Sequence, residues 1–139
     1  MDIVKEMKPI LVVDDESIVR ESIIDWLREV GYRAEPAESG EQALDMIAAR
    51  DFSLLILDYR LPGKSGVEVL RAAKANKPET KAIIITAFPS SALNRELRDL
   101  GALGDLLVKP VATEDLEKLV MRKLSEVEAQ GVQRRPAAR

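Results

Sequence analysis

The sequence predicts an α/β fold in which a parallel β-sheet is covered by helices on both of its faces. Five short apolar runs alternate with five amphipathic stretches along 139 residues, which is the order of elements that builds a parallel sheet. The strongest runs are apolar throughout instead of alternating with polar residues, and this indicates strands buried on both sides. The length suits one domain with a single substantial core.

The first two strand candidates flank an amphipathic helix. Residues 9–13 are an apolar run that stops at two aspartates. Gly31 stands at the position after a helix that commonly takes a left-handed backbone. Residues 32–36 are a second, weaker strand candidate. Apolar residues at near-helical spacing mark the helix between them: Ile18, Ile23, Ile24, Leu27 and Val30.

The second helix and third strand follow the same alternation. Ser39 is expected to cap a helix over residues 40–50, because Gln42 three positions later resembles a capping box. Residues 54–57 form a buried-strand run that ends at Asp58.

Two further helices surround the fourth strand. A helix is expected over about residues 65–76, and a shorter one over about residues 90–100. Between them, residues 82–85 form an apolar run that ends at Thr86. The continued alternation strengthens the prediction of a parallel sheet.

The last strand and helix close the pattern. Residues 105–108 form the fifth run, which ends at Lys109 and Pro110. The final helix is expected to start after a cap at Thr113, with acidic residues placed favourably against its N-terminal dipole. Its apolar period is lost from about residue 128, so we expect a domain over residues 7–127 and a flexible tail or the start of a linker over residues 128–139.

Composition narrows the chemistry. There are no cysteines and no histidines, which removes disulfides, thiolate metal sites and the usual general base near neutral pH. The absence of cysteine suits a cytoplasmic protein. A net charge of −3 creates no field that attracts nucleic acid, so we expect this domain to bind none. No apolar run approaches the roughly 20 residues that cross a bilayer, so no membrane association is expected.

Polar residues terminate four of the five apolar runs. Asp14 and Asp15 follow the first run, Asp58 the third, Thr86 the fourth and Lys109 the fifth. The carboxyl ends of parallel strands share one edge of the sheet, so these side chains should converge. Three clustered carboxylates need a positive charge between them, and Mg2+ prefers oxygen ligands. Carboxylates, a hard cation, a lysine and a hydroxyl suit phosphoryl transfer onto an aspartate.

Each of these features also has an ordinary structural explanation. The two aspartates after the first run could cap a helix, and Asp58, followed by Pro62 and Gly63, could open a turn. Thr86 is a β-branched residue in a favoured place, and Lys109 could lie in a surface loop. For each feature taken singly, the structural explanation is at least as good as the functional one. Their joint occurrence at strand ends favours a functional site.

The motifs together resemble the receiver domains of two-component response regulators, the CheY-like family. The resemblance covers about residues 8–126 and implies a flavodoxin-like sheet with strand order 2-1-3-4-5. It rests on Val12-Val13-Asp14-Asp15-Glu16, on Asp58-Tyr59-Arg60-Leu61-Pro62-Gly63-Lys64-Ser65-Gly66, on Thr86-Ala87 and on Lys109-Pro110.

The resemblance implies a role for each site residue. Asp58 would be the phosphoacceptor, and Asp15, Asp58 and the backbone carbonyl of Arg60 would bind Mg2+ directly, with Asp14 acting mainly through water. The remaining implied roles belong to the last two strand ends: Lys109, with a cis bond to Pro110, would contact the phosphoryl oxygens, and Thr86 would move toward them.

One departure from the family pattern and one pair of flanking residues concern regulation. Leu106 replaces the aromatic residue that commonly accompanies the threonine switch, so the usual aromatic signal is in doubt while no ligand is lost. Arg60 and Phe88 flank the acceptor where the family tunes dephosphorylation, and an altered phosphoryl lifetime is expected, with its direction left open.

The resemblance also implies partners. A sensor histidine kinase or a phosphotransfer protein would supply the phosphoryl group, because this chain has no histidine of its own. The switch would control an output domain or a protein partner, and the face of the fourth helix, fifth strand and fifth helix could form a homodimer. The domain would promote its own phosphorylation and dephosphorylation without being an enzyme of the usual kind.

Three alternatives remain open at this stage. An aspartate-nucleophile phosphatase would need a second acid two residues after the nucleophile, where Arg60 stands. An interaction module that has lost phosphorylation would not need all five residues: Asp14, Asp15, Asp58, Thr86 and Lys109. A nucleotide- or flavin-binding domain is disfavoured because the first loop is acidic and lacks glycine.

Overall fold

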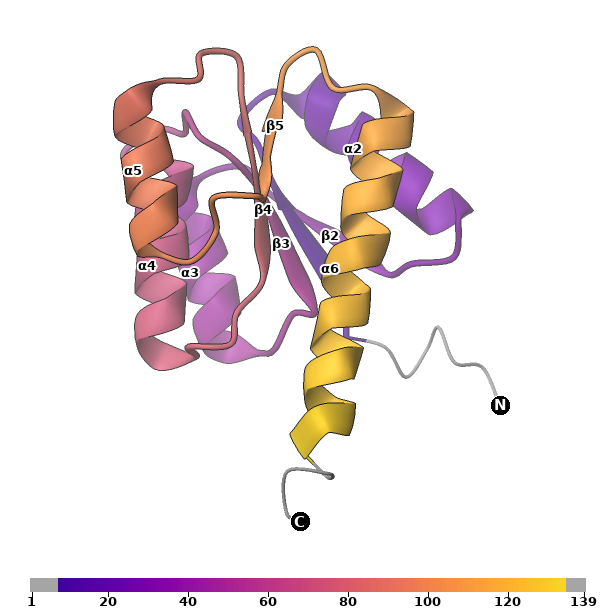
Figure 1. The fold of residues 1–139 in the computed structure, drawn as a ribbon. Helices are drawn as coiled ribbons and strands as arrows, with labels where there is room; N and C mark the ends of the chain where they lie inside the picture. The colour runs from indigo at the N-terminus through magenta and orange to yellow at the C-terminus, as the bar shows by residue number, and fades with distance from the viewer. Residues whose placement is uncertain (1–7, 135–139) are drawn as a thin grey trace.

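The computed structural model describes residues 8–134, and their side chains as far as residue 126. It confirms the predicted α/β fold: five parallel strands in the order β2-β1-β3-β4-β5 with helices on both faces (Figure 1). The elements are β1 (Ile10–Val13), α2 (Ser17–Glu29), β2 (Ala34–Ala37), α3 (Gly40–Ala49), β3 (Leu54–Asp58), α4 (Gly66–Asn76), β4 (Ala82–Thr86), α5 (Ser91–Asp99), β5 (Leu106–Val108) and α6 (Thr113–Arg134).

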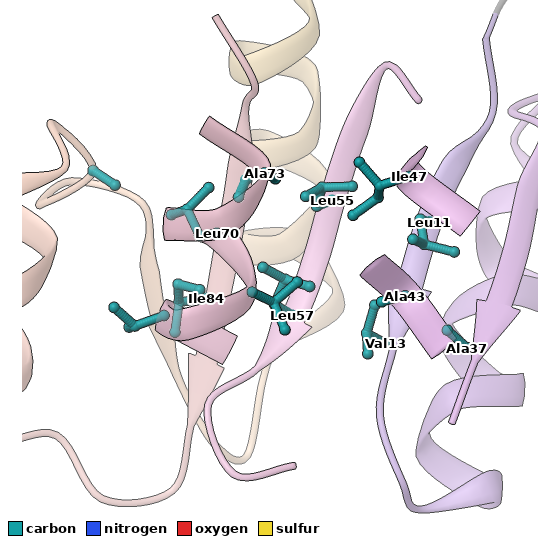
Figure 2. Close-up of a cluster of buried hydrophobic side chains, with 14 of the residues drawn as sticks. Leu11, Val13, Ala37, Ala43, Ile47, Leu55, Leu57, Leu70, Ala73 and Ile84 are labelled. Carbon is teal, nitrogen blue, oxygen red and sulfur yellow. The ribbon is translucent and has the colours of Figure 1, made fainter. Parts of the chain in front are cut away.

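The sheet separates two hydrophobic cores. Successive residues of a strand point to opposite faces, so Leu11 and Val13 face one core while Ile10 and Val12 face the other. The first core lies under α3, α4 and α5, and Figure 2 shows its strand residues packed with residues of α3 and α4, such as Ala43. The second core lies under α2 and α6. Burial on both faces explains why the strand runs are apolar throughout.

Serine caps fix the starts of three helices. Ser39, Ser65 and Ser90 each accept a hydrogen bond from the backbone N–H three residues ahead, which satisfies a donor that the helix itself leaves free. The predicted capping box at Ser39 is only half formed, because the Gln42 side chain accepts from the N–H of Glu38.

Several element ends differ from the sequence prediction. β2 begins at Ala34, because the N–H of Tyr32 is bonded to the Leu27 carbonyl at the end of α2. Thr113 is the first residue of α6 and not its cap, since the Ala112 carbonyl accepts from Leu116.

α6 runs to Arg134, seven residues beyond the predicted domain boundary at 127. Residues 128–134 of the predicted tail or linker are thus helical, and residues 135–139 lie outside the described part of the chain. The division between domain and linker therefore stays a prediction. None of the described helices is both long and apolar enough to cross a membrane.

Sheet register brings the ends of four strands to the same edge. Val13 pairs with Leu57, Asp58 with Ile85, and Thr86 with Val108. Residues that directly follow these pairs, including Asp14 and Lys109, must therefore lie along one edge of the sheet.

Candidate functional site

Asp58 and Lys109 form the centre of the site. Asp58 is the last residue of β3 and is buried, and Lys109 follows the last residue of β5. The Lys109 Nζ donates to Asp58 Oδ2 at 2.9 Å, and the backbone N–H of Arg60 approaches Asp58 Oδ1 at 3.3 Å. The Lys109–Pro110 peptide bond is cis, the isomer that the family resemblance implies.

Two further carboxylates surround the same ammonium group. Lys109 Nζ lies 3.8 Å from Asp14 Oδ2 and 3.6 Å from Glu16 Oε1. Oxygen atoms of Asp14, Glu16 and Asp58 all lie within 4.8 Å of one another, close enough to share a metal ion. Sequence reasoning missed Glu16 as a candidate ligand. Glu16 directly follows the aspartate pair, and its side chain is mostly exposed, but the turn brings one carboxylate oxygen to 3.6 Å from Lys109 Nζ.

Asp15, the other predicted carboxylate of the first turn, lies outside the group of three, and its role as a ligand stays a prediction. It is exposed, and its carboxylate is not one of the three that come together in this structure. The first turn instead buries Asp14, which is only 3% exposed. Asp14 Oδ1 accepts a hydrogen bond from the N–H of Glu16 at 2.9 Å, and this bond keeps the Asp14 carboxylate beside Asp58.

Burial and charge perturb both Asp14 and Lys109. Burial raises the pKa of Asp14 from 3.8 to about 6, and the neighbouring Asp58 adds to the rise against the opposing effects of the Glu16 N–H and Lys109. Burial lowers the pKa of Lys109, but the hydrogen bond to Asp58 and the three surrounding carboxylates outweigh it, so that the pKa is raised overall. Lys109 is therefore a permanent cation among carboxylates that repel one another.

A glycine allows the next helix to approach Asp58. The N–H of Gly66, the first residue of α4, donates to the Tyr59 carbonyl at 2.8 Å. A Cβ atom on Gly66 would lie 2.4 Å from the backbone oxygen of Asp58, which no side chain could tolerate. Glycine at this position thus sets the path of the loop that carries Arg60 beside the carboxylate.

Thr86 and Leu106 lie near the site without contacting the acceptor. The Thr86 hydroxyl accepts from the N–H of Phe88 at 3.1 Å, and within the described residues no hydrogen bond joins it to Asp58. Leu106 is half-buried and packs against the core under α5. The Thr86 carbonyl accepts from the N–H of Lys109 at 2.8 Å, so the threonine and the lysine are linked through the backbone.

The donor set fits a magnesium ion. Three carboxylates opposed by one ammonium group leave a formal charge of −2, which a divalent cation would neutralise. All the side-chain donors are oxygens, and hard oxygen ligands suit Mg2+ better than the softer transition metals.

The family assignment follows from this arrangement and from a family comparison. Residues 10–121 match the response regulator receiver domain model. The chain belongs to this family. As a receiver domain it is a signalling switch of a response regulator, and its sheet order is that of the flavodoxin-like fold.

Relatives of this receiver domain support the assignment. Sporulation initiation phosphotransferase F of Bacillus subtilis is 31% identical over 115 residues, which are 83% of this chain and 92% of the relative. Response regulator MprA of Mycobacterium avium is 38% identical over 127 residues, which are 88% of this chain and 55% of the relative. The solved response regulator TrrA of Thermotoga maritima, in complex with Mg2+ and BeF, superposes with a TM-score of 0.74 at 37% identity, covering 84% of this chain and 99% of that one.

The shares of length differ among these relatives. The receiver domain spans nearly all of the sporulation protein but between 30% and 55% of several other curated relatives. What the longer proteins do as a whole therefore does not transfer to this chain by similarity.

Proposed function

We propose that Asp58 is the phosphoacceptor of this receiver domain. The observation that carries the proposal is the position of its carboxylate, which lies at the end of β3, buried, within 2.9 Å of the Lys109 ammonium and beside two further carboxylates. An oxygen of Asp58 would attack phosphorus, and the bond from phosphorus to the leaving nitrogen or oxygen of the donor would break, with its electron pair departing on the donor.

Magnesium would be held by carboxylates of this cluster together with the backbone carbonyl of Arg60. Asp14, Glu16 and Asp58 are the carboxylates that already lie together, and Asp15, the next residue of the same turn, would join them as a ligand when the ion binds. When bound, the ion supplies positive charge against the carboxylates and the phosphoryl oxygens. The same site would promote both phosphorylation and dephosphorylation.

Lys109 and Thr86 would respond to the new charge. Phosphorylation adds roughly −1.5 to −2 charges and several acceptor oxygens. The Lys109 ammonium already contacts the acceptor oxygen, and the Thr86 hydroxyl would leave the N–H of Phe88 to donate to the phosphoryl group. Leu106, packed under α5, would adjust with Thr86 in place of the usual aromatic residue.

The phosphoryl group would come from a histidine kinase or a phosphotransfer protein, because this chain contains no histidine. We place this exchange in the cytoplasm. The switch would act on an output domain or a protein partner, with a homodimer through the α5, β5 and α6 face as one form of output, and without direct binding of nucleic acid or membrane.

Labelling with a small phosphodonor tests the proposal. Purified protein is incubated with acetyl phosphate, with and without Mg2+, and the intact mass is measured. We expect one added phosphoryl group that requires Mg2+ in the wild type and is absent in Asp58→Asn. The matched control is Asp51→Asn, which changes an exposed aspartate that pairs with Lys77, and this variant should label normally.

The same assay separates the alternatives. Labelling that persists in Asp58→Asn would show that another residue is the acceptor. A wild type that never labels would support an interaction module without phosphorylation. Steady hydrolysis of a phosphate monoester such as p-nitrophenyl phosphate would support a phosphatase, which we do not expect because Arg60 stands where that class needs an acid.

A further inference from the structure

We infer that Arg20 is a positioning residue that holds Asp14 in the place where its carboxylate faces Asp58. The inference rests on the magnesium-binding part of the proposed function. Arg20 lies in the second turn of α2, outside the carboxylate cluster, and nothing in the strand-end pattern of the sequence singles it out.

The contact between Arg20 and Asp14 is buried and short. Arg20 is only 7% exposed, which is rare for an arginine unless its guanidinium is paired. Its Nη1 donates to the backbone carbonyl of Asp14 at 2.7 Å, in a bond that is itself buried. A charged donor makes a stronger hydrogen bond than a neutral one, so this bond holds firmly the residue that directly follows β1.

Three hydrogen bonds together fix the Asp14 turn. The Asp14 N–H donates to the Ala37 carbonyl at 3.2 Å, the Asp14 carbonyl accepts from Arg20, and the Asp14 carboxylate accepts from the N–H of Glu16. The peptide planes on both sides of the Asp14 Cα are thereby held. Because the direction of the side chain follows from the backbone, the carboxylate has little freedom to turn away from Asp58.

The other terminal nitrogen of the Arg20 guanidinium lies near the loop that follows β2. This atom, Nη2, lies 3.7 Å from Glu38 Oε1, and the Glu38 carboxylate is 74% exposed, so this pair adds little attraction. The N–H of Glu38 in turn donates to the Gln42 side chain at 2.8 Å. The buried bond to Asp14, and not this exposed pair, must therefore carry any effect of Arg20 on the site.

Charge and position predict opposite effects for removal of Arg20. If Arg20 acted only through its charge, its loss would make the site more negative and would tighten Mg2+ binding. If Arg20 positions Asp14, its loss frees the turn and weakens Mg2+ binding, as loss of groups that orient metal ligands generally does. The sign of the change in affinity therefore decides between the two.

A calorimetric titration with Mg2+ alone, on the full chain, tests the inference. We expect the dissociation constant of Arg20→Met to rise about 10-fold, and Arg20→Lys, which keeps the charge but loses the planar fork, to show a smaller rise in the same direction. The matched control is Arg28→Met. Arg28 lies in the last turn of the same helix and also donates to a backbone carbonyl, that of Ala34 at 2.9 Å, but at the opposite edge of the sheet, so its loss should leave Mg2+ affinity unchanged.

Two further readouts separate positioning from damage to the fold. Urea unfolding gives the stability lost by each variant, which should be larger for the buried Arg20 than for the exposed Arg28, so Mg2+ affinity is compared where both variants are fully folded. Under those conditions only Arg20→Met should weaken Mg2+ binding. With saturating Mg2+, phosphodonor labelling of Arg20→Met should regain the wild-type rate. Arg20→Lys decides the question by itself should Arg20→Met fail to fold.

Unchanged or tighter Mg2+ binding in the Arg20 variants would overturn the inference and leave the proposed function intact. A wild type that binds no Mg2+ would overturn the proposed magnesium site and this inference with it. Equal weakening in Arg20→Met and Arg28→Met would also overturn the inference, because the effect would then come from a looser α2.

Discussion

The guanidinium of Arg60 lies over the ring of Phe88, with its Cζ atom 4.7 Å from the ring centroid. Arg60 follows β3 and Phe88 follows β4, so this cation–π contact bridges two loops at the edge where Asp58 lies. The backbone N–H groups of the same two residues bond to Asp58 and Thr86. The contact therefore ties together the loops that carry the proposed acceptor and the proposed switch.

Breaking this contact should shorten the lifetime of the phosphoryl group. Phe88→Ala removes the ring and uncovers one side of the loop beside Asp58, giving water a freer approach. We expect hydrolysis to be faster by about two- to fivefold, the effect of an interaction worth about 0.5–1 kcal/mol at an exposed site. The measurement is the decay of labelled protein after removal of the phosphodonor.

A double variant tests whether the contact itself is responsible. Arg60→Ala keeps the backbone carbonyl and should accelerate decay about as much as Phe88→Ala, and the double variant should be no faster than either single one. Arg50→Ala is the control, because Arg50 makes a comparable contact over Phe52, remote from the site. Additive effects of the two single changes would show that the side chains act independently.

Removing the buried negative charge of Asp14 should stabilise the protein at neutral pH. The pKa of Asp14 is raised from 3.8 to about 6, so the folded state binds the proton more tightly than the unfolded state does. At pH values above about 6, keeping the Asp14 carboxylate ionised in the folded state therefore lowers the free energy of unfolding. We expect Asp14→Asn to raise the free energy of unfolding by about 1–2 kcal/mol at about pH 7.5 without Mg2+.

The stability gained by Asp14→Asn should depend on pH in one direction. As the pH falls from about 7 to about 4, the wild-type Asp14 becomes protonated in the folded state, and the advantage of Asp14→Asn should vanish. Urea unfolding at several pH values measures it. Addition of Mg2+ should stabilise the wild type more than the variant. An advantage that grows as the pH falls would contradict the raised pKa.

Lys109 should be needed for stability when Mg2+ is absent. Its ammonium is the cation that lies within 3.8 Å of all three carboxylates. Lys109→Met leaves those charges facing one another, and we expect a loss of about 1–3 kcal/mol in the free energy of unfolding. Mg2+ should recover part of the loss, because it replaces the missing positive charge. Lys77→Met, which affects only a surface pair with Asp51, should change neither stability nor the response to Mg2+.

A second buried ion pair should matter for stability and not for phosphorylation. Lys123 Nζ lies 2.9 Å from Asp105 Oδ2, with both residues under 10% exposed. Asp105 directly precedes β5, so it lies at the amino ends of the strands, whereas Asp58 lies at their carboxyl ends. Lys123→Met leaves the carboxylate buried with only Arg122 at 3.7 Å, and we expect a loss of about 3 kcal/mol on urea unfolding.

The double variant supplies the control for this pair. Asp105→Asn with Lys123→Met removes both charges of this pair and should be more stable than Lys123→Met alone, because the Asp105 site no longer holds an unpaired charge. Glu126, which also lies 2.9 Å from Lys123 Nζ, loses that partner in both variants, so its loss cancels in the comparison. Phosphodonor labelling should proceed at the wild-type rate in both. A slower rate in Lys123→Met would show that the start of β5 is coupled to the site at its other end.

Most of the fold could be predicted from the sequence because the apolar runs are local and uninterrupted. Strands that are buried on both faces, such as Leu54–Asp58, leave little ambiguity. Errors occurred at ends where a tertiary hydrogen bond decides the outcome. Tyr32 has the composition of a strand residue, but its N–H is taken by the end of α2, and no sequence pattern reveals that competition.

The sequence indicated which residues gather at the edge of the sheet better than it indicated how their side chains are arranged there. Strand ends located Asp14, Asp58, Thr86 and Lys109, because parallel topology alone brings such positions to one edge. The approach of the Glu16 carboxylate to Lys109 and the exposure of Asp15 depend on the turn after β1, which Arg20 and Ala37 hold from outside the motif. Residues that act through a neighbour's backbone leave no mark in a pattern of side-chain types.

The shortness of β5 has a mechanical consequence for signalling. β5 comprises only Leu106–Val108, pairs with β4 on one side, and has no strand on the other. A shift of Lys109 along the sheet would therefore disturb only the short pairing between β5 and β4. A shift of Asp14 or Asp58 would disturb β1 or β3, each of which pairs with a strand on both sides. A movement of β5, which lies between α5 and α6 along the chain, would therefore break fewer strand pairings than a movement of β1 or β3.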